Sequence, residues 1–101
     1  MLRQIVIIKK GNIIYHREYG ETFSFEAIAP LFMSLTYFLE EAKENVACDI
    51  LNTVFYKIAY STKKEMDVLF ILVTDISDPD EVIEEKIREF NRETTKVVEG
   101  A

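Results

Sequence analysis

The stretch SFEAIAPLFMSLTYFLEEAKEN, residues 24–45, has the longest helical pattern in the chain and holds most of its large apolar residues. When successive residues are placed about 100° apart around a helix, eight apolar side chains fall within one arc of roughly 140°. They are Phe25, Ile28, Leu31, Phe32, Leu35, Phe38, Leu39 and Ala42. Such an arc predicts a helix that packs one side against a sheet or another helix.

Three polar or helix-breaking residues bear on where this helix starts and stops. The Ser24 hydroxyl can accept a hydrogen bond from a first-turn N–H, as helix caps do. Asn45 tolerates the left-handed conformation that ends many helices. Pro30 removes one backbone hydrogen bond and crowds the preceding turn, so the helix either begins near Pro30 after an initial turn or is kinked there.

The opposite side of the same helix carries Met33 and Tyr37, which are four residues apart and therefore neighbours on its surface. Polar residues surround them, and Glu41 lies one turn beyond Tyr37. Methionine and tyrosine are enriched at protein interfaces. We therefore predict that Met33, Tyr37 and Glu41 face a partner; the alternative is that the chain's own terminus covers the two apolar residues.

A strand, a tight turn and a second strand are predicted before the helix. Residues 5–8 (IVII) are continuously apolar, which indicates a strand inside a sheet. Residues 9–12 form a polar turn whose Gly11 and Asn12 tolerate positive φ. Residues 13–19 have a more mixed pattern on both faces, so we predict that they form an edge strand.

Three further strands are predicted after the helix. Residues 48–53 and 54–61 have the β-like pattern of two short strands, and residues 61–65 have the composition of a solvated turn. The segment DVLFILVT, residues 67–74, is apolar at six consecutive positions. Both faces of such a strand must be covered, so it is predicted to lie at the centre of the sheet beside residues 5–8.

A second helix is predicted after residue 78. Asp78 is the expected N-cap, with Pro79 at the first helical position and Glu81 two residues further on. The chain beyond Thr94 either extends this helix or docks after a break. A narrow apolar stripe of Ile83, Ile87 and Phe90, with Val82 and Thr94 beside it, is predicted to face the sheet.

The predicted elements follow in the order β-β-α-β-β-β-α. Two strands that are apolar on both faces, together with two amphipathic helices, predict an α+β fold: a mostly antiparallel five-stranded sheet with a helix on each face. We expect residues 1–101 to form a single domain, because a chain of this length has room for one ordinary core.

Charge and composition exclude several classes of partner. The net charge of −6, from 18 acidic and 12 basic residues, opposes binding to nucleic acid, which depends on basic surfaces. The longest apolar run, residues 68–73, is too short to span a bilayer, so no direct membrane insertion is expected. With one cysteine and no signal-peptide pattern at the N-terminus, we expect a cytoplasmic protein.

No set of residues predicts catalysis, a cofactor or a metal site. His16 is the only histidine and has no second histidine or cysteine pair to complete a site. The acidic residues between Asp75 and Glu81 lack the spacing of a calcium loop and are better explained as a helix start. Cys48 is followed by Asp49, which raises a thiol pKa, and no histidine or arginine is evident near it in sequence. We therefore expect a protein that is not an enzyme.

Three segments resemble the longin domain, a module found in some SNAREs, adaptor-complex small subunits, sedlin-type trafficking subunits and GTPase regulators. They are IVIIKKGNIIYHREYG (residues 5–20), the long helix, and VFYKIAYSTKKEMDVLFILVTDISDPDEVIEEKIREF (residues 54–90). The resemblance covers about residues 4–93 and includes no catalytic motif, so it concerns the fold. It implies strand order 2-1-5-4-3.

The same resemblance implies where partners bind. Longin and related roadblock assemblies commonly pair the first helix and the third strand with a second copy, which adds Asp49, Ile50 and Asn52 to the predicted interface. Longins usually carry a further C-terminal helix, whereas at most residues 96–101 remain here. The resemblance therefore does not establish the layer that this further helix forms over the sheet in longins.

Two functions are therefore predicted. The first is a non-enzymatic interaction module, a dimerising platform for a small Ras-like GTPase or a trafficking-type complex, whose partner is itself or a longin/roadblock-type protein. The alternative is a small-molecule-sensing domain with a pocket between the sheet and the first helix.

Overall fold

The computed structural model describes residues 2–20, 25–41 and 45–99. Its elements are β1 (Leu2–Lys9), β2 (Asn12–Glu18), α1 (Phe25–Glu41), β3 (Asp49–Asn52), β4 (Tyr56–Lys63), a 3-10 turn (Lys64–Met66), β5 (Val68–Asp75) and α2 (Asp80–Glu99). The predicted cap Ser24 lies outside the described residues. Because α1 already begins at Phe25 and contains Pro30, the alternative in which the helix begins near Pro30 is wrong.

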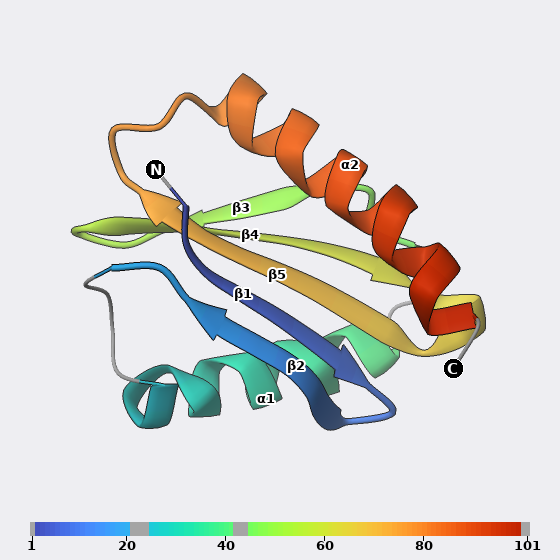
Figure 1. Ribbon diagram of the computed structural model, residues 1–101. Helices are drawn as coiled ribbons and strands as arrows, with labels where there is room; N and C mark the ends of the chain where they lie inside the picture. The colour runs from blue at the N-terminus through green and yellow to red at the C-terminus, as the bar shows by residue number, and fades with distance from the viewer. Residues whose placement is uncertain (1, 21–24, 42–44, 100–101) are drawn as a thin grey trace.

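The five strands form one sheet in the order β2-β1-β5-β4-β3, and every neighbouring pair is antiparallel. Helix α1 covers one face of this sheet and α2 the other (Figure 1). The predicted α+β fold, element order and strand order are therefore confirmed.

The two central strands are buried on both faces, as their continuous apolar runs predicted. All residues from Val68 to Thr74 in β5 are buried, and so are residues 4–8 in β1. Alternation along the strands divides their side chains between the helices. Toward α1, Phe32 and Leu35 pack with Val6, Ile8, Ile58, Leu69, Ile71 and Val73. Toward α2, Ile83 and Ile87 pack with Ile5, Ala59 and Leu72, and the Phe90 ring meets Phe70 edge-on at 5.6 Å between ring centroids.

The turn between β1 and β2 lies within the predicted residues 9–12, but Lys10 rather than Asn12 joins Gly11 in the left-handed conformation. Lys10 and Gly11 have φ values of 52° and 76°, which is the pattern of the hairpin turn with two left-handed central residues. Asn12 already belongs to β2, and its amide donates to the Lys10 carbonyl at 3.3 Å. The hairpin twist, more than residue preference, therefore places Lys10 in a conformation that its side chain disfavours.

The prediction of a solvated turn at residues 61–65 is wrong for its first part, because Ser61 and Thr62 are buried and continue β4 to Lys63. The turn begins only at Lys64, and Glu65 within it is exposed. Val46, just before β3, exchanges backbone and side-chain hydrogen bonds with Thr62, and Asn91 of α2 donates to the Ser61 hydroxyl at 2.7 Å. These polar residues are buried because partners distant in sequence satisfy their hydroxyl groups.

Both helices depart in detail from their predicted patterns. Leu31, placed in the buried arc of α1, is 37% exposed, because it lies at the margin of the arc. Helix α2 begins at Asp80, and the Pro79 carbonyl accepts from the N–H groups of Val82 and Ile83, so the cap position is one residue later than the predicted Asp78. The helix continues unbroken to Glu99. Val82, placed beside the stripe, is exposed.

Removing the Phe32 side chain should test how much the α1 contact stabilises the sheet. Phe32 is fully buried, so Phe32→Ala should lower the free energy of unfolding by about 3–5 kcal/mol through lost burial and a residual cavity. Urea denaturation, monitored by circular dichroism, measures this change in the free energy of unfolding. Ser34→Ala, on the exposed side of the same helix, should change it by less than about 0.5 kcal/mol. Equal effects from the two variants would contradict the assigned orientation of α1.

Candidate partner interface

The outer face of α1 carries the predicted apolar pair at the surface. Met33 is 47% and Tyr37 is 71% exposed, and Glu41 is exposed one turn further along. Phe32 and Leu35, on the other side of the helix, are buried. Among the described residues, α1 therefore has one face that is buried in the core and a second face whose apolar groups are exposed to solvent.

Strand β3 forms one outer edge of the sheet, and its backbone geometry can be worked out from the neighbouring turn. The Thr53 N–H donates to the Tyr56 carbonyl at 2.8 Å. Because bonding directions alternate along an antiparallel strand, Asp49 and Leu51 also direct their backbone groups toward β4. Ile50 and Asn52 therefore direct theirs outward, where a strand from another molecule could pair.

The Asp49 carboxylate is occupied on both oxygens by groups of the same chain. Its Oδ1 accepts from the Ile50 N–H at 2.9 Å, and its Oδ2 accepts from the Tyr60 hydroxyl at 2.7 Å. Burial, followed by this hydrogen bond to a carboxylate, raises the pKa of Tyr60 to about 12. Asp49 therefore holds the edge strand and covers one of its outward N–H groups, while the Ile50 carbonyl and both Asn52 backbone groups point outward.

The six predicted interface residues do not share one side of the sheet. Leu51 packs with the cluster under α1, whereas Ile50 packs with the cluster under α2. Alternation along β3 then places the Asp49 side chain on the α1 side and that of Asn52 on the α2 side. Met33, Tyr37, Glu41 and Asp49 thus belong to the α1 side, and Ile50 and Asn52 contribute through the strand edge.

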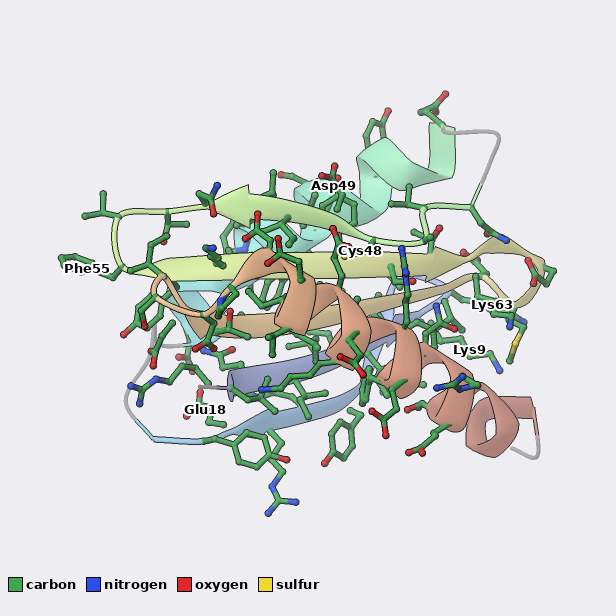
Figure 2. The ribbon with its side chains drawn as sticks, turned by 90° about the horizontal axis from the view of Figure 1, so that it is seen from above. Lys9, Glu18, Cys48, Asp49, Phe55 and Lys63 are labelled. Atoms are coloured by element: carbon green, nitrogen blue, oxygen red, sulfur yellow. The ribbon has the colours of Figure 1, made fainter. Side chains whose placement is uncertain are left out.

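Helix α1 nevertheless extends toward the β3 edge. Seen from above the sheet, the C-terminal part of α1 projects beyond β3 (Figure 2). The C-terminal end of α1 and the open β3 edge therefore lie on the same side of the molecule.

A second apolar surface was not predicted from the sequence. Val54 and Phe55 are 81% and 69% exposed in the turn between β3 and β4, and Ile76 is 41% exposed in the loop after β5. The Ile76 N–H donates to the Phe55 carbonyl at 3.2 Å, so the two loops lie side by side. We call Val54, Phe55 and Ile76 the tip patch. Its first two residues were assigned to a strand because their composition is β-like.

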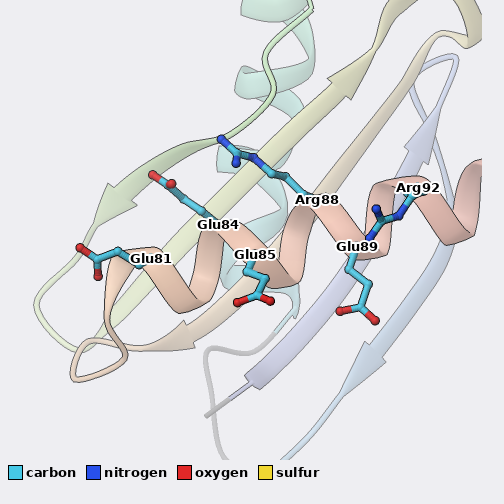
Figure 3. Close-up of a pocket in the computed structure, with 6 residues that line it drawn as sticks. All are labelled: Glu81, Glu84, Glu85, Arg88, Glu89 and Arg92. Carbon is cyan, nitrogen blue, oxygen red and sulfur yellow. The ribbon is translucent and has the colours of Figure 1, made fainter.

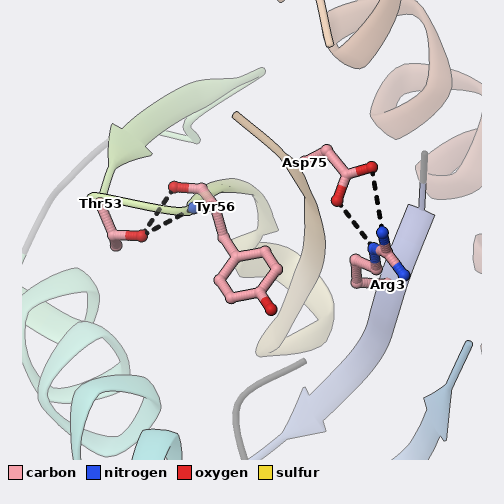
Figure 4. Close-up of polar contacts among 4 residues, drawn as sticks. All are labelled: Arg3, Thr53, Tyr56 and Asp75. Carbon is pink, nitrogen blue, oxygen red and sulfur yellow. Dashed lines mark hydrogen bonds and ion pairs between the residues drawn. The ribbon is translucent and has the colours of Figure 1, made fainter. Parts of the chain in front are cut away.

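Polar contacts hold the loops on either side of the tip patch (Figure 4). The Thr53 hydroxyl donates to the Tyr56 carbonyl at 2.9 Å and accepts from its N–H at 3.0 Å. Arg3, at the start of β1, donates to both carboxylate oxygens of Asp75, at 2.7 and 3.3 Å. Gly20 allows this approach, because a Cβ there would lie 2.9 Å from the Arg3 guanidinium.

The residues weighed for catalysis do not gather into a reactive site. His16 Nε2 lies 3.7 Å from the Glu18 carboxylate on the same strand. Burial, followed by the nearby Glu84 carboxylate, raises the pKa of the Cys48 thiol. Arg88, which is distant in sequence, opposes this shift, and the net direction is as predicted. No three His, Cys, Asp or Glu side chains of residues 2–20, 25–41 and 45–99 are placed to hold a metal ion.

A hollow on the solvent side of α2 is lined only by charged side chains (Figure 3). They are Glu81, Glu84, Glu85, Arg88, Glu89 and Arg92. A small-molecule site needs apolar walls with a few convergent polar groups, so we interpret this hollow as a solvated helix face. Beneath α1, Phe32 and Leu35 pack between the helix and the sheet. The alternative prediction, a small-molecule-sensing domain, placed its pocket in this region.

No protein-family model matches the chain, and no curated protein matches it in sequence. Neither described helix combines the length and the apolar character that crossing a bilayer demands. The fold and the exposed surfaces are therefore what bears on function.

The Arg3–Asp75 contact should make stability depend on pH in a defined direction. The hydrogen bond from Arg3 lowers the pKa of Asp75. A carboxyl group whose pKa is lower in the folded state stabilises the protein above its unfolded pKa, about 3.9, and loses this effect as pH falls through the folded pKa. Asp75→Asn should therefore lower the melting temperature at pH 7, and the gap from wild type should narrow progressively as the pH falls below about 4.

Glu85→Gln is the matched control, since Glu85 is an exposed carboxylate on α2. Scanning calorimetry from pH 7 to about pH 2.5 should show a small gap for this variant at every pH. A wild-type advantage over Asp75→Asn that stays constant down to the lowest pH would rule out this role for Asp75.

Proposed function

We propose that this protein is a non-enzymatic, longin-like interaction module that dimerises, with a second copy or with a longin/roadblock-type domain. Support comes first from the fold, since the strand order 2-1-5-4-3 is the order that the longin resemblance implies. The observation that carries the proposal is the exposed Met33–Tyr37 face of α1, a helix whose C-terminal end lies on the same side of the molecule as the open β3 edge.

The two halves of this surface offer complementary kinds of contact. Tyr37 and Met33 provide apolar area that a partner helix can cover, and such aromatic residues often carry much of an interface's binding energy. The outward groups of Ile50 and Asn52 can extend the sheet into a partner strand. Asp49 limits the register of such pairing, because its carboxylate already accepts from the Ile50 N–H.

We further propose that the dimer acts in the cytoplasm as a platform for a small Ras-like GTPase or a trafficking-type complex. The GTPase and trafficking roles rest on the longin resemblance alone. The non-enzymatic part of the proposal rests on the sequence, in which no set of nucleophile, base and stabilising donor can be assembled.

Replacing Tyr37 tests the proposed dimer surface. Tyr37→Asp places a charge where apolar contact is expected, so it should shift a concentration-dependent dimer toward monomer without changing the melting temperature. Multi-angle light scattering over a range of protein concentrations measures the mass. Tyr15→Asp, the same substitution at a 42% exposed tyrosine on β2, should leave the mass unchanged.

Two results would count against the dimer surface. One is a wild-type protein that stays monomeric at high concentration. The other is an unchanged mass for Tyr37→Asp when the wild type does dimerise.

A further inference from the structure

The tip patch exposes large apolar side chains where the fold does not need them. Turn positions ordinarily carry Gly, Asn, Asp or Pro, which suit turn conformations and remain hydrated. Here Val54 and Phe55 occupy the turn and are among the most exposed large apolar residues described. Phe55 points away from the end of the sheet (Figure 2). Neither side chain belongs to a core cluster of the described residues.

The patch is also held in shape before any partner arrives. Hydrogen bonds between Thr53 and Tyr56 close the turn on both sides of Val54 and Phe55. The contact between Ile76 and Phe55 joins this turn to the loop after β5, and Arg3 anchors that loop through Asp75. A preorganised apolar surface loses little conformational entropy on binding.

The charges next to the patch select the kind of partner. Residues 75–81, the chain around Ile76, carry four carboxylates and no basic side chain, and the described cations that contact this loop include Arg3 and Lys57. Lys57 Nζ donates to Asp80 Oδ1 at 2.6 Å and to the Asp78 carbonyl at 2.9 Å. The segment itself therefore contributes four negative charges and no positive one. The carboxylates are those of Asp75, Asp78, Asp80 and Glu81.

An apolar patch with an acidic border matches one class of partner better than others. Anionic lipid headgroups and nucleic-acid phosphates are repelled by the border. A peptide segment with an apolar side chain flanked by Lys or Arg complements both the patch and its acidic border. The apolar group covers the patch, and the cations pair with the carboxylates.

We propose that Val54, Phe55 and Ile76 form a docking surface for a protein segment in which an apolar anchor is flanked by basic residues. This surface adjoins the β3 edge, since Val54 follows Asn52 by two residues, but it differs from the Met33–Tyr37 face. It lies at the end of the sheet near the N-terminal end of α1, whereas Tyr37 lies in the other half of that helix (Figure 1). A dimer joined through the Met33–Tyr37 face would leave the patch open to a second, different partner.

Selection from a library of random dodecapeptides displayed on phage tests this assignment. Wild-type protein is the bait, and the double variant Val54→Ser, Phe55→Ser removes binders of other surfaces. Enriched peptides should combine aromatic or aliphatic residues with neighbouring Lys or Arg. A synthetic peptide of the enriched class should bind the double variant at least about tenfold more weakly, as expected when anchor contacts are lost.

Three further variants separate this surface from others. Ile14→Ser, Tyr15→Ser removes a similar exposed apolar pair on β2 and should leave peptide binding unchanged. Tyr37→Asp should also leave it unchanged, whether or not the protein dimerises, so a failed dimer proposal does not decide this one. Asp78→Asn, Glu81→Gln should weaken binding several-fold and reduce its dependence on salt.

Four outcomes would overturn the proposal. They are the absence of any enriched class, enrichment of acidic or uncharged peptides, equal binding to the Val54→Ser, Phe55→Ser variant while that variant keeps the wild-type melting temperature, and sedimentation with phosphatidylcholine–phosphatidylserine vesicles that depends on Val54 and Phe55. The last outcome would assign the patch to a membrane surface.

Discussion

Burial of β1 and β5 on both faces is the constraint on which the rest of the structure depends. A strand such as Val68–Asp75, apolar at every position from 68 to 73, cannot leave either face in water, so the fold must supply a cover on each side. Helix α1 supplies one through Phe32 and Leu35, and α2 supplies the other through Ile83 and Ile87.

The sheet has two different edges as a result. Strand β2 closes one side with a mixed, largely exposed set of side chains. Strand β3 closes the other side with only four residues, and Asp49 covers one of its outward N–H groups. Short edges with a bonded acidic residue resist uncontrolled pairing with other chains. The same edge can still accept a partner that fits the groups left open, which is why its position on the same side of the molecule as the C-terminal end of α1 matters.

The two exposed apolar surfaces differ in the contacts that fix their positions. The Met33–Tyr37 face belongs to a helix whose other side is buried, so the orientation of this face follows from core packing. The tip patch instead depends on polar contacts between loops, with Thr53 closing one loop and Arg3 anchoring the other. Neither surface is needed to complete the core of the described residues. Both therefore point to binding rather than to folding.

Local patterns in the sequence determined the element order, the central strands and the outward pair Met33–Tyr37, because helical and strand periodicity are properties of neighbouring residues. The strand order came from the longin resemblance together with the doubly apolar runs. The sequence did not predict the tip patch, because that patch depends on contacts between loops that are distant in the chain.

Only the tertiary structure decided the remaining features, since each depends on partners far apart in the chain. Ser61 and Thr62 have the composition of a turn, yet Val46 and Asn91 satisfy them inside a buried strand. Val54 and Phe55 have the composition of a strand, yet the bonds of Thr53 and Tyr56 turn the chain there. Local propensity is worth tenths of a kcal/mol per residue, whereas a buried hydrogen bond left unmade costs about 1–3 kcal/mol. Tertiary contacts therefore prevailed at these positions.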